Sequence, residues 1–153
     1  MARNKVTIDA SPEVVFDVLT DPDAYPKWVV GAKKIRAVDP DWPEVGSRFH
    51  HTVGTGAASL DDSTKVLEID PAKRLVLEAR ARPMGRALVE MHVGPTGAGT
   101  HVTMLERLIE TTGAGILSRL VDPLIHVRNV ESLRRLRRVA EERARSGASS
   151  VRG

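Results

Sequence analysis

The sequence has no cysteine and few aromatic residues. The absence of cysteine from its 153 residues excludes disulfides, thiolate metal sites and a cysteine nucleophile. Aromatic side chains make up only 3% of the chain, so each of them is informative. No apolar run approaches the roughly 18 residues of a membrane span, and the first residues do not resemble a signal peptide. We therefore expect a cytoplasmic protein without membrane insertion.

Common catalytic and metal-binding motifs are also missing. The five histidines show no HxH, HxxxH or HExxH spacing, so we expect no metal site. The glycines near residue 97 are not followed by the Lys-Ser/Thr pair of a phosphate-binding loop, and no nucleophile elbow occurs. We expect no cofactor.

The remaining composition is that of an ordinary globular domain, with 41% apolar and 28% charged residues. This length suits one domain, which we expect over residues 1–146, followed by a flexible Ser/Gly/Arg tail at 147–153.

Charge is nearly balanced, with a formal net charge of +3. Much of the arginine lies near the C-terminus, where Glu131 and Arg135 have the i,i+4 spacing of ordinary helix-surface pairs. We therefore expect a solvated helix face and no specific nucleic-acid partner. The charged residues of the predicted strands are expected on the outer face of a sheet: Arg80, Arg82, Glu90 and His92.

The longest amphipathic stretch, Gly113 to about Ala144, predicts a helix. Its apolar residues recur at steps of three and four and are expected to share one buried side: Ile116, Leu117, Leu120, Leu124, Val127, Val130, Leu133, Leu136 and Ala140. Pro123 predicts a kink or a break, and Gly147 predicts the end of the helix.

The residues before this helix predict a sheet and two short helices. Residues 5–9 alternate as a half-buried strand does, and Ser11 with Pro12 is typical of a helix N-terminus. Residues 21–28 predict a second short helix, and alternation from Lys33 to Glu110 predicts about six strands. We expect an α+β fold in which an antiparallel sheet receives the apolar side of the long helix.

This order of elements resembles the START-like, helix-grip superfamily, and in particular its polyketide cyclase/dehydrase and lipid-transport branch. The resembling segments are residues 10–16, residues 21–28, Gly46, the turn at 70–75, residues 99–103 and residues 129–136. The resemblance covers nearly the whole chain. It implies a curved sheet around the long C-terminal helix, with an apolar cavity between them. It does not select one function, because the family includes ligand carriers, cyclases, hormone receptors and partner-binding modules.

Small residues on facing elements agree with such a cavity, since Ala79, Ala81 and Ala87 fall on strands and glycines precede the long helix. We expect the following residues in its wall: Trp28, Phe49, His51, Met91, Met104, Ile116, Leu120 and Leu124. Methionines that merely fill an irregular core are the alternative. The segment Tyr25–Trp28 and the start of the long helix are expected at the opening.

Two side chains are candidates for proton transfer. His51 shares a strand face with Phe49 and is expected to point inward, as a general base, a hydrogen-bond donor or a core residue. Glu106 shares a face with Met104, but both faces of that strand are partly apolar. Glu106 is therefore either a carboxylate in an apolar cavity with a raised pKa, or a partner of an arginine on the outer face.

Three functions stay open. The first is binding of a small hydrophobic molecule, similar to a lipid or a polyketide. The second is a polyketide cyclase or dehydratase that uses His51 or Glu106. The third is a non-enzymatic module that binds a macromolecule through its basic helix or outer sheet face. A homodimer stays open as the oligomeric state.

Overall fold

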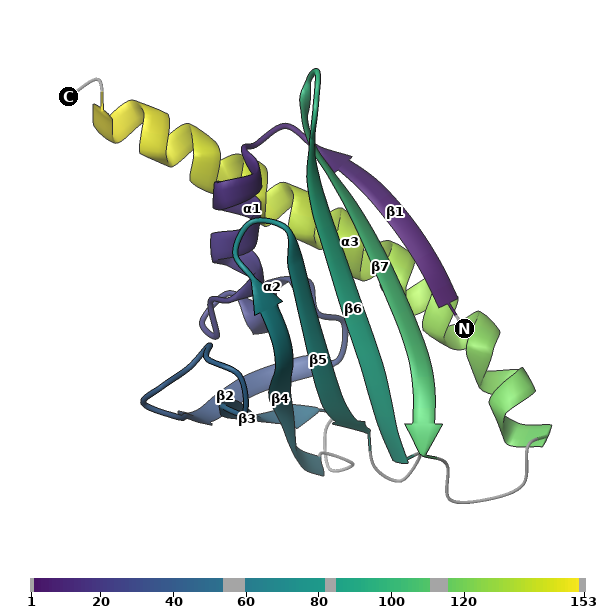
Figure 1. Cartoon of the computed structure of the whole chain (residues 1–153). Coiled ribbons are helices and arrows are strands. Elements are labelled where there is room, and N and C mark those ends of the chain that lie inside the picture. Colours follow the sequence, from purple (N-terminus) through teal and green to yellow (C-terminus); the bar gives the residue numbers. More distant parts are fainter. Residues whose placement is uncertain (1, 54–59, 82–84, 111–115, 152–153) are drawn as a thin grey trace.

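A computed structural model of the chain describes residues 2–53, 60–81, 85–110 and 116–151. It confirms the predicted α+β fold, with an antiparallel sheet packed against a long C-terminal helix (Figure 1). The elements in chain order are β1 (Ala2–Ile8), α1 (Pro12–Leu19), α2 (Tyr25–Trp28), β2 (Ala32–Val38), β3 (Arg48–Val53), β4 (Leu60–Asp70), β5 (Arg74–Ala81), β6 (Gly85–Thr96), β7 (Gly99–Glu110) and α3 (Ile116–Val151).

The seven strands form one sheet in the order β1-β7-β6-β5-β4-β3-β2. Strands β2 to β7 follow one another as a meander, and β1 joins at the far edge by pairing antiparallel with β7. Figure 1 shows α3 crossing behind β6 and β7, so the helix covers one face of the sheet. The short helices α1 and α2 both contact α3.

Local sequence signals explain the first helix. The Ser11 hydroxyl accepts a hydrogen bond from the backbone N–H of Val14 at 3.2 Å, and Pro12 occupies the first turn, where it removes no helical hydrogen bond. The buried side of α1 consists of Val15, Phe16, Val18 and Leu19. This side joins the core and anchors the chain before α2.

The core lies between the sheet and the C-terminal half of α3. Met91 on β6 is directly opposite Met104 on β7, and both pack in one buried cluster with Leu133 and Leu136 of α3. The direction of β7 is thereby settled, because the face that carries Val102, Met104 and Glu106 is the buried one.

The face and the extent of α3 differ from the prediction. Its buried residues are Ile125, Asn129, Ser132, Leu133, Leu136 and Ala140. By contrast, Leu124, Val127 and Val130 are 70%, 66% and 41% exposed, so their predicted burial is wrong. Around Arg128 and Asn129, the side of α3 that faces the sheet contacts the carboxylate of Glu106. Polar residues therefore occupy that side of the helix. The helix also continues through Pro123 without a break and past Gly147, where its end was expected.

Candidate functional site

A cavity of about 400 Å³ lies between the inner face of the sheet and α3. Its wall comes from α2 and the residues that follow it, from strands β3 to β7, and from α3. The lining residues are Tyr25, Trp28, Val29, Val30, Gly31, His51, Thr64, Leu77, Ala79, Arg80, Ala87, Val89, Met104, Glu106, Arg128, Asn129 and Ser132. The cavity is within the size range of small-molecule sites, about 300–1,000 Å³.

Small side chains on neighbouring strands create the space. Thr64 on β4 is directly opposite Ala79 on β5, and Ala79 is directly opposite Ala87 on β6. A row of three short side chains across the sheet leaves room that larger apolar residues would fill. The expectation that Ala79 and Ala87 open a cavity is therefore confirmed, whereas the side chain of Ala81 lies outside the described residues.

Aromatic rings gather at the α2 end of the cavity. The ring of Tyr25 is 5.9 Å from that of Trp28, 4.7 Å from that of Phe49 and 5.3 Å from that of His51, measured between ring centroids. The contacts of Tyr25 with Trp28 and Phe49 are edge contacts, which hold rings in a defined orientation, and the ring of His51 is tilted against that of Tyr25. The backbone N–H of Val30, just after α2, donates to the Ser132 hydroxyl at 3.1 Å and ties this end to α3.

A chain of hydrogen bonds connects the side chains of His51, Thr64 and Tyr25. His51 Nε2 is 3.0 Å from the Thr64 hydroxyl, which also hydrogen-bonds to the Tyr25 phenol. Burial raises the pKa of Tyr25 to about 12, and the hydrogen bond with Thr64 opposes part of that shift. Burial lowers the pKa of His51 to about 4, while the nearby carboxylate of Asp62 acts in the opposite direction. At neutral pH the imidazole and the phenol are therefore both uncharged.

Two buried nitrogens of the cavity wall have no hydrogen-bond partner among the described residues. They are the Nε1 atom of Trp28 and the Nδ1 atom of His51. Both residues are nearly inaccessible, at 4% and 2% exposure. Because an unpaired buried polar group costs free energy, these atoms are suited to an oxygen or nitrogen atom of a bound molecule.

Glu106 lies on the opposite side of the cavity with two partners from α3. Arg128 Nη2 contacts both carboxylate oxygens, at 2.6 and 2.8 Å, and Asn129 Nδ2 donates to Oε2 at 2.7 Å. Of the two alternatives for Glu106, the inward direction is confirmed and the outer-face ion pair is wrong. The carboxylate points inward and not to the outer face, and it lies beside a cation and an amide instead of in apolar surroundings.

The structure brings together some of the predicted wall and separates the rest. Trp28, His51 and Met104 line the cavity, as does Glu106. Phe49 and Met91 are buried in the core but do not border the space, and Leu124 is exposed on α3. The side chains of Ile116 and Leu120 lie outside the described residues. Tyr25 and Trp28 do lie at the cavity, whereas the predicted opening at the start of the long helix falls outside the described residues.

Sequence reasoning missed the polar partners from the helix and from β4. Arg128 was assigned to a solvated face, and Asn129, Ser132 and Thr64 were not considered as site residues. One signal existed, because Asn129 and Ser132 are uncharged polar residues spaced three apart next to the buried Leu133. A polar pair beside the buried side of a helix indicates a polar partner inside the fold.

Two features are absent from the part of the chain that the structure describes, a cluster of metal-ligating side chains and a long apolar helix. There, no cluster of three or more His, Asp or Glu side chains is placed to hold a metal ion. Nor does any described helix combine the length and apolar character needed to cross a membrane.

Comparison with known proteins identifies the family and the fold. A family model described as polyketide cyclase / dehydrase and lipid transport matches residues 2–141. Comparison with curated proteins finds no match.

Solved structures share the fold at low sequence identity. A protein from Chromobacterium violaceum is 20% identical with a TM-score of 0.69, over 91% of this chain and 96% of that one. A protein from Rhodobacter sphaeroides is 18% identical with a TM-score of 0.71, over 90% of this chain and 89% of that one. The di-domain ARO/CYC StfQ from the steffimycin biosynthetic pathway is 14% identical with a TM-score of 0.72, over 93% of this chain and 50% of that one. These similarities concern the fold alone.

Proposed function

Because the chain belongs to the polyketide cyclase/dehydrase and lipid transport family, we propose that it binds a small hydrophobic molecule in the cavity between the sheet and α3. One observation carries the proposal. The wall of the cavity of about 400 Å³ is mainly apolar, and two of its residues carry buried nitrogens, Trp28 Nε1 and His51 Nδ1, that have no partner among the described residues. Apolar walls with a few oriented polar groups are typical of ligand sites.

This arrangement favours a particular kind of molecule. Leu77, Val89 and Met104 offer an apolar surface to its body. A carbonyl or hydroxyl group near the aromatic end would give Trp28 Nε1 an acceptor. Glu106 and Arg128, in another part of the wall, form an ion pair whose charges cancel. These two side chains can therefore hydrogen-bond an uncharged ligand.

Probe binding tests the proposal. An apolar fluorescent probe should bind the wild-type protein with about micromolar affinity, read from the emission of the probe itself. Ala87→Leu adds three carbon atoms to the wall and should weaken binding at least about tenfold, because the added atoms occupy the space of the ligand. Ala98→Leu adds the same atoms at an exposed turn and should leave the affinity unchanged.

The result that would contradict the proposal is equal probe affinity in wild type and Ala87→Leu while both melt cooperatively. Native mass spectrometry of freshly purified protein provides an independent measurement. A co-purified small molecule should be present in the wild type and reduced in Ala87→Leu.

A second function, cyclisation or dehydration of a polyketide-like substrate, is supported by the position of His51. Its imidazole is uncharged at neutral pH, buried in the cavity wall and hydrogen-bonded to Thr64 through Nε2, which leaves Nδ1 for a substrate. As a general base it would accept a proton from a carbon between two carbonyl groups, that carbon would attack a third carbonyl, and the imidazolium would return the proton to the resulting alkoxide. Glu106 is less suited to this role, because Arg128 and Asn129 occupy its carboxylate.

His51→Gln distinguishes the two functions. A carrier should keep its bound molecule chemically unchanged, whereas a cyclase should convert a linear poly-ketone in the wild type and retain but not convert it in His51→Gln. Liquid chromatography with mass spectrometry measures both outcomes, because cyclisation alone changes the retention time and dehydration also removes the mass of one water molecule.

A further inference from the structure

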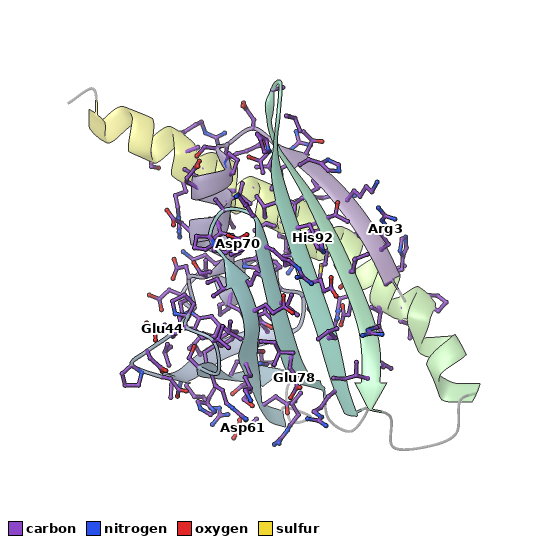
Figure 2. All side chains as sticks on the ribbon, in the orientation of Figure 1. Arg3, Glu44, Asp61, Asp70, Glu78 and His92 are labelled. Carbon is purple, nitrogen blue, oxygen red and sulfur yellow. The ribbon has the colours of Figure 1, made fainter. Side chains whose placement is uncertain are left out.

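The outer face of the sheet, turned away from α3, contains a hollow of about 70 Å³ across β3, β4, β5 and β6. Its walls are formed by Arg48, Ser63, Lys65, Glu78, Arg80 and Arg86. Figure 2 shows Glu78 on this face, in front of the strands, with α3 behind them. Neighbouring residues on the same strands, among them Thr64 and Ala79, point to the opposite face and line the inner cavity.

The hollow concentrates positive charge in an unfavourable way. Arg48 is directly opposite Lys65 on the neighbouring strand, and Arg80 is directly opposite Arg86. Like charges opposite each other across strands repel and destabilise a sheet. The single acid of the hollow, Glu78, accepts a hydrogen bond from Arg86 Nη1 at 3.1 Å. Four cationic side chains therefore surround one carboxylate.

The side chains of three of these cations form no ion pair in the described part of the chain, although the backbone N–H of Arg48 donates to the Asp39 carboxylate at 2.9 Å. Arg48, Lys65 and Arg80 form no ion pair with any described carboxylate, although Lys65 is opposite Glu78 in the strand register. Arg80 also borders the inner cavity. Arg74, elsewhere on the outer face, is different, because it is 2.6 Å from Glu68 and 3.6 Å from Glu90. The three cations of the hollow are thus less balanced than Arg74.

We propose that this hollow binds a single phosphate group, either as inorganic phosphate or as the phosphate of a small ester. A phosphate carries about two negative charges and three acceptor oxygens. Guanidinium groups bind such oxygens through paired N–H donors, and the Ser63 hydroxyl adds one further donor. A water molecule needs about 10–15 Å³ of such space, so a hollow of about 70 Å³ has room for a group of several heavy atoms such as phosphate. The remainder of an ester would stay outside.

This site can be tested separately from the proposed cavity ligand, although Arg80 borders both spaces. Arg48 and Lys65 do not line the cavity, so their replacement should not alter binding of an apolar probe. Phosphate binding should also be steeply salt-dependent, because it relies on exposed charges, whereas binding of the probe should not. The failure of one proposal is therefore distinguishable from failure of the other.

Titration calorimetry with inorganic phosphate at low ionic strength tests the proposal, and glycerol 3-phosphate serves as the ester. The wild type should bind at least one of them, and Lys65→Gln and Arg48→Gln should each weaken binding at least about tenfold. Arg74→Gln is the matched control, since it removes an equal charge from the same face at a balanced site, and it should leave affinity unchanged. Binding of the apolar probe should be unchanged in all three variants.

Two results would overturn the proposal. One is the absence of phosphate and ester binding by the cooperatively folded wild type. The other is an equal loss of affinity in Arg74→Gln and Lys65→Gln, which would mean that only the overall charge of the protein matters. Tighter binding of glycerol 3-phosphate than of phosphate would support the site and assign it to an ester. The reverse order would support it as an inorganic phosphate site.

Discussion

Glu106 is a buried carboxylate whose two polar partners both come from α3. At 5% exposure it depends on Arg128 and Asn129 to replace the water it loses on folding. Removing one member of a buried pair is costly because the other charge stays buried without its partner, whereas removing both is often close to neutral. Comparing the single and the double replacement therefore shows whether the ion pair contributes to stability.

Arg128→Met should therefore lower the free energy of unfolding by about 1–3 kcal/mol, a value below that of fully buried pairs because the Arg128 side chain is 41% exposed. The double variant Glu106→Leu/Arg128→Met should recover part of this loss. Urea denaturation at pH 7 measures both. A double variant less stable than Arg128→Met would show that the buried charge is not the source of the destabilisation.

His51 makes stability depend on pH with a defined sign. Its pKa is lowered to about 4 in the folded protein, chiefly by burial, against about 6.5 in an unfolded chain. Between these values the unfolded state binds more protons than the folded state, so stability rises with pH. The contribution of neutral His51 is complete above pH ~6.5 and is lost as pH falls toward ~4.

The difference between wild type and His51→Gln isolates this contribution, because other groups titrate equally in both. From pH 7.5 to pH 5, the wild type should lose about 1–2 kcal/mol more unfolding free energy than the variant. Gln keeps a polar partner for Thr64. Urea denaturation at the two pH values measures the effect. Identical losses in the two proteins would show that His51 does not have the lowered pKa.

At the scale of elements, α3 has two differently used halves. Its C-terminal half places Leu133, Leu136 and Ala140 in the core, as the apolar spacing predicts. Its preceding turns direct Asn129 and Ser132 inward and leave Leu124 and Val127 exposed. One leucine from each half therefore makes a matched pair, with the same substitution in the same helix.

Leu136→Ala should lower the free energy of unfolding by about 2–5 kcal/mol, because Leu136 is 0% exposed and its removal leaves a cavity in the core. Leu124→Ala should change it by less than about 0.5 kcal/mol, since Leu124 is 70% exposed. Chemical denaturation measures both. Equal losses would show that the apolar stripe predicted from the sequence, and not the observed face, is the buried one.

Across the whole molecule, the sheet separates two kinds of site. Its inner face and α3 enclose the mainly apolar cavity, and its outer face bears the cationic hollow. The two sites share the strands β3, β4, β5 and β6, because successive side chains of a strand point to opposite faces. Binding in the inner cavity can therefore be measured while the hollow on the outer face is empty, and the reverse.

The sequence alone predicted most of the architecture, because its signals are local. Ser11 and Pro12 mark the start of α1, and alternation marks the strands. Their order, with the long helix at the end, led to the α+β fold and to the family. Part of the site followed in the same way, since alternation from Phe49 places His51 on the inner face, where it lines the cavity. Trp28 and Met104 were likewise correct as lining residues.

Only the tertiary structure decided which face of β7 points inward and which residues pair with Glu106. Alternation along β7 groups Glu106 with Met104 but does not say which face is inside when both are partly apolar. The register with β6 and the position of α3 settle it, and they bring Arg128 and Asn129 to Glu106 across more than twenty residues of sequence. The apolar spacing of α3 likewise did not identify its buried face, because that face is set by the groups it meets. Helix and strand periods belong to the local chain, whereas the pairing of a buried charge depends on residues that only folding brings together.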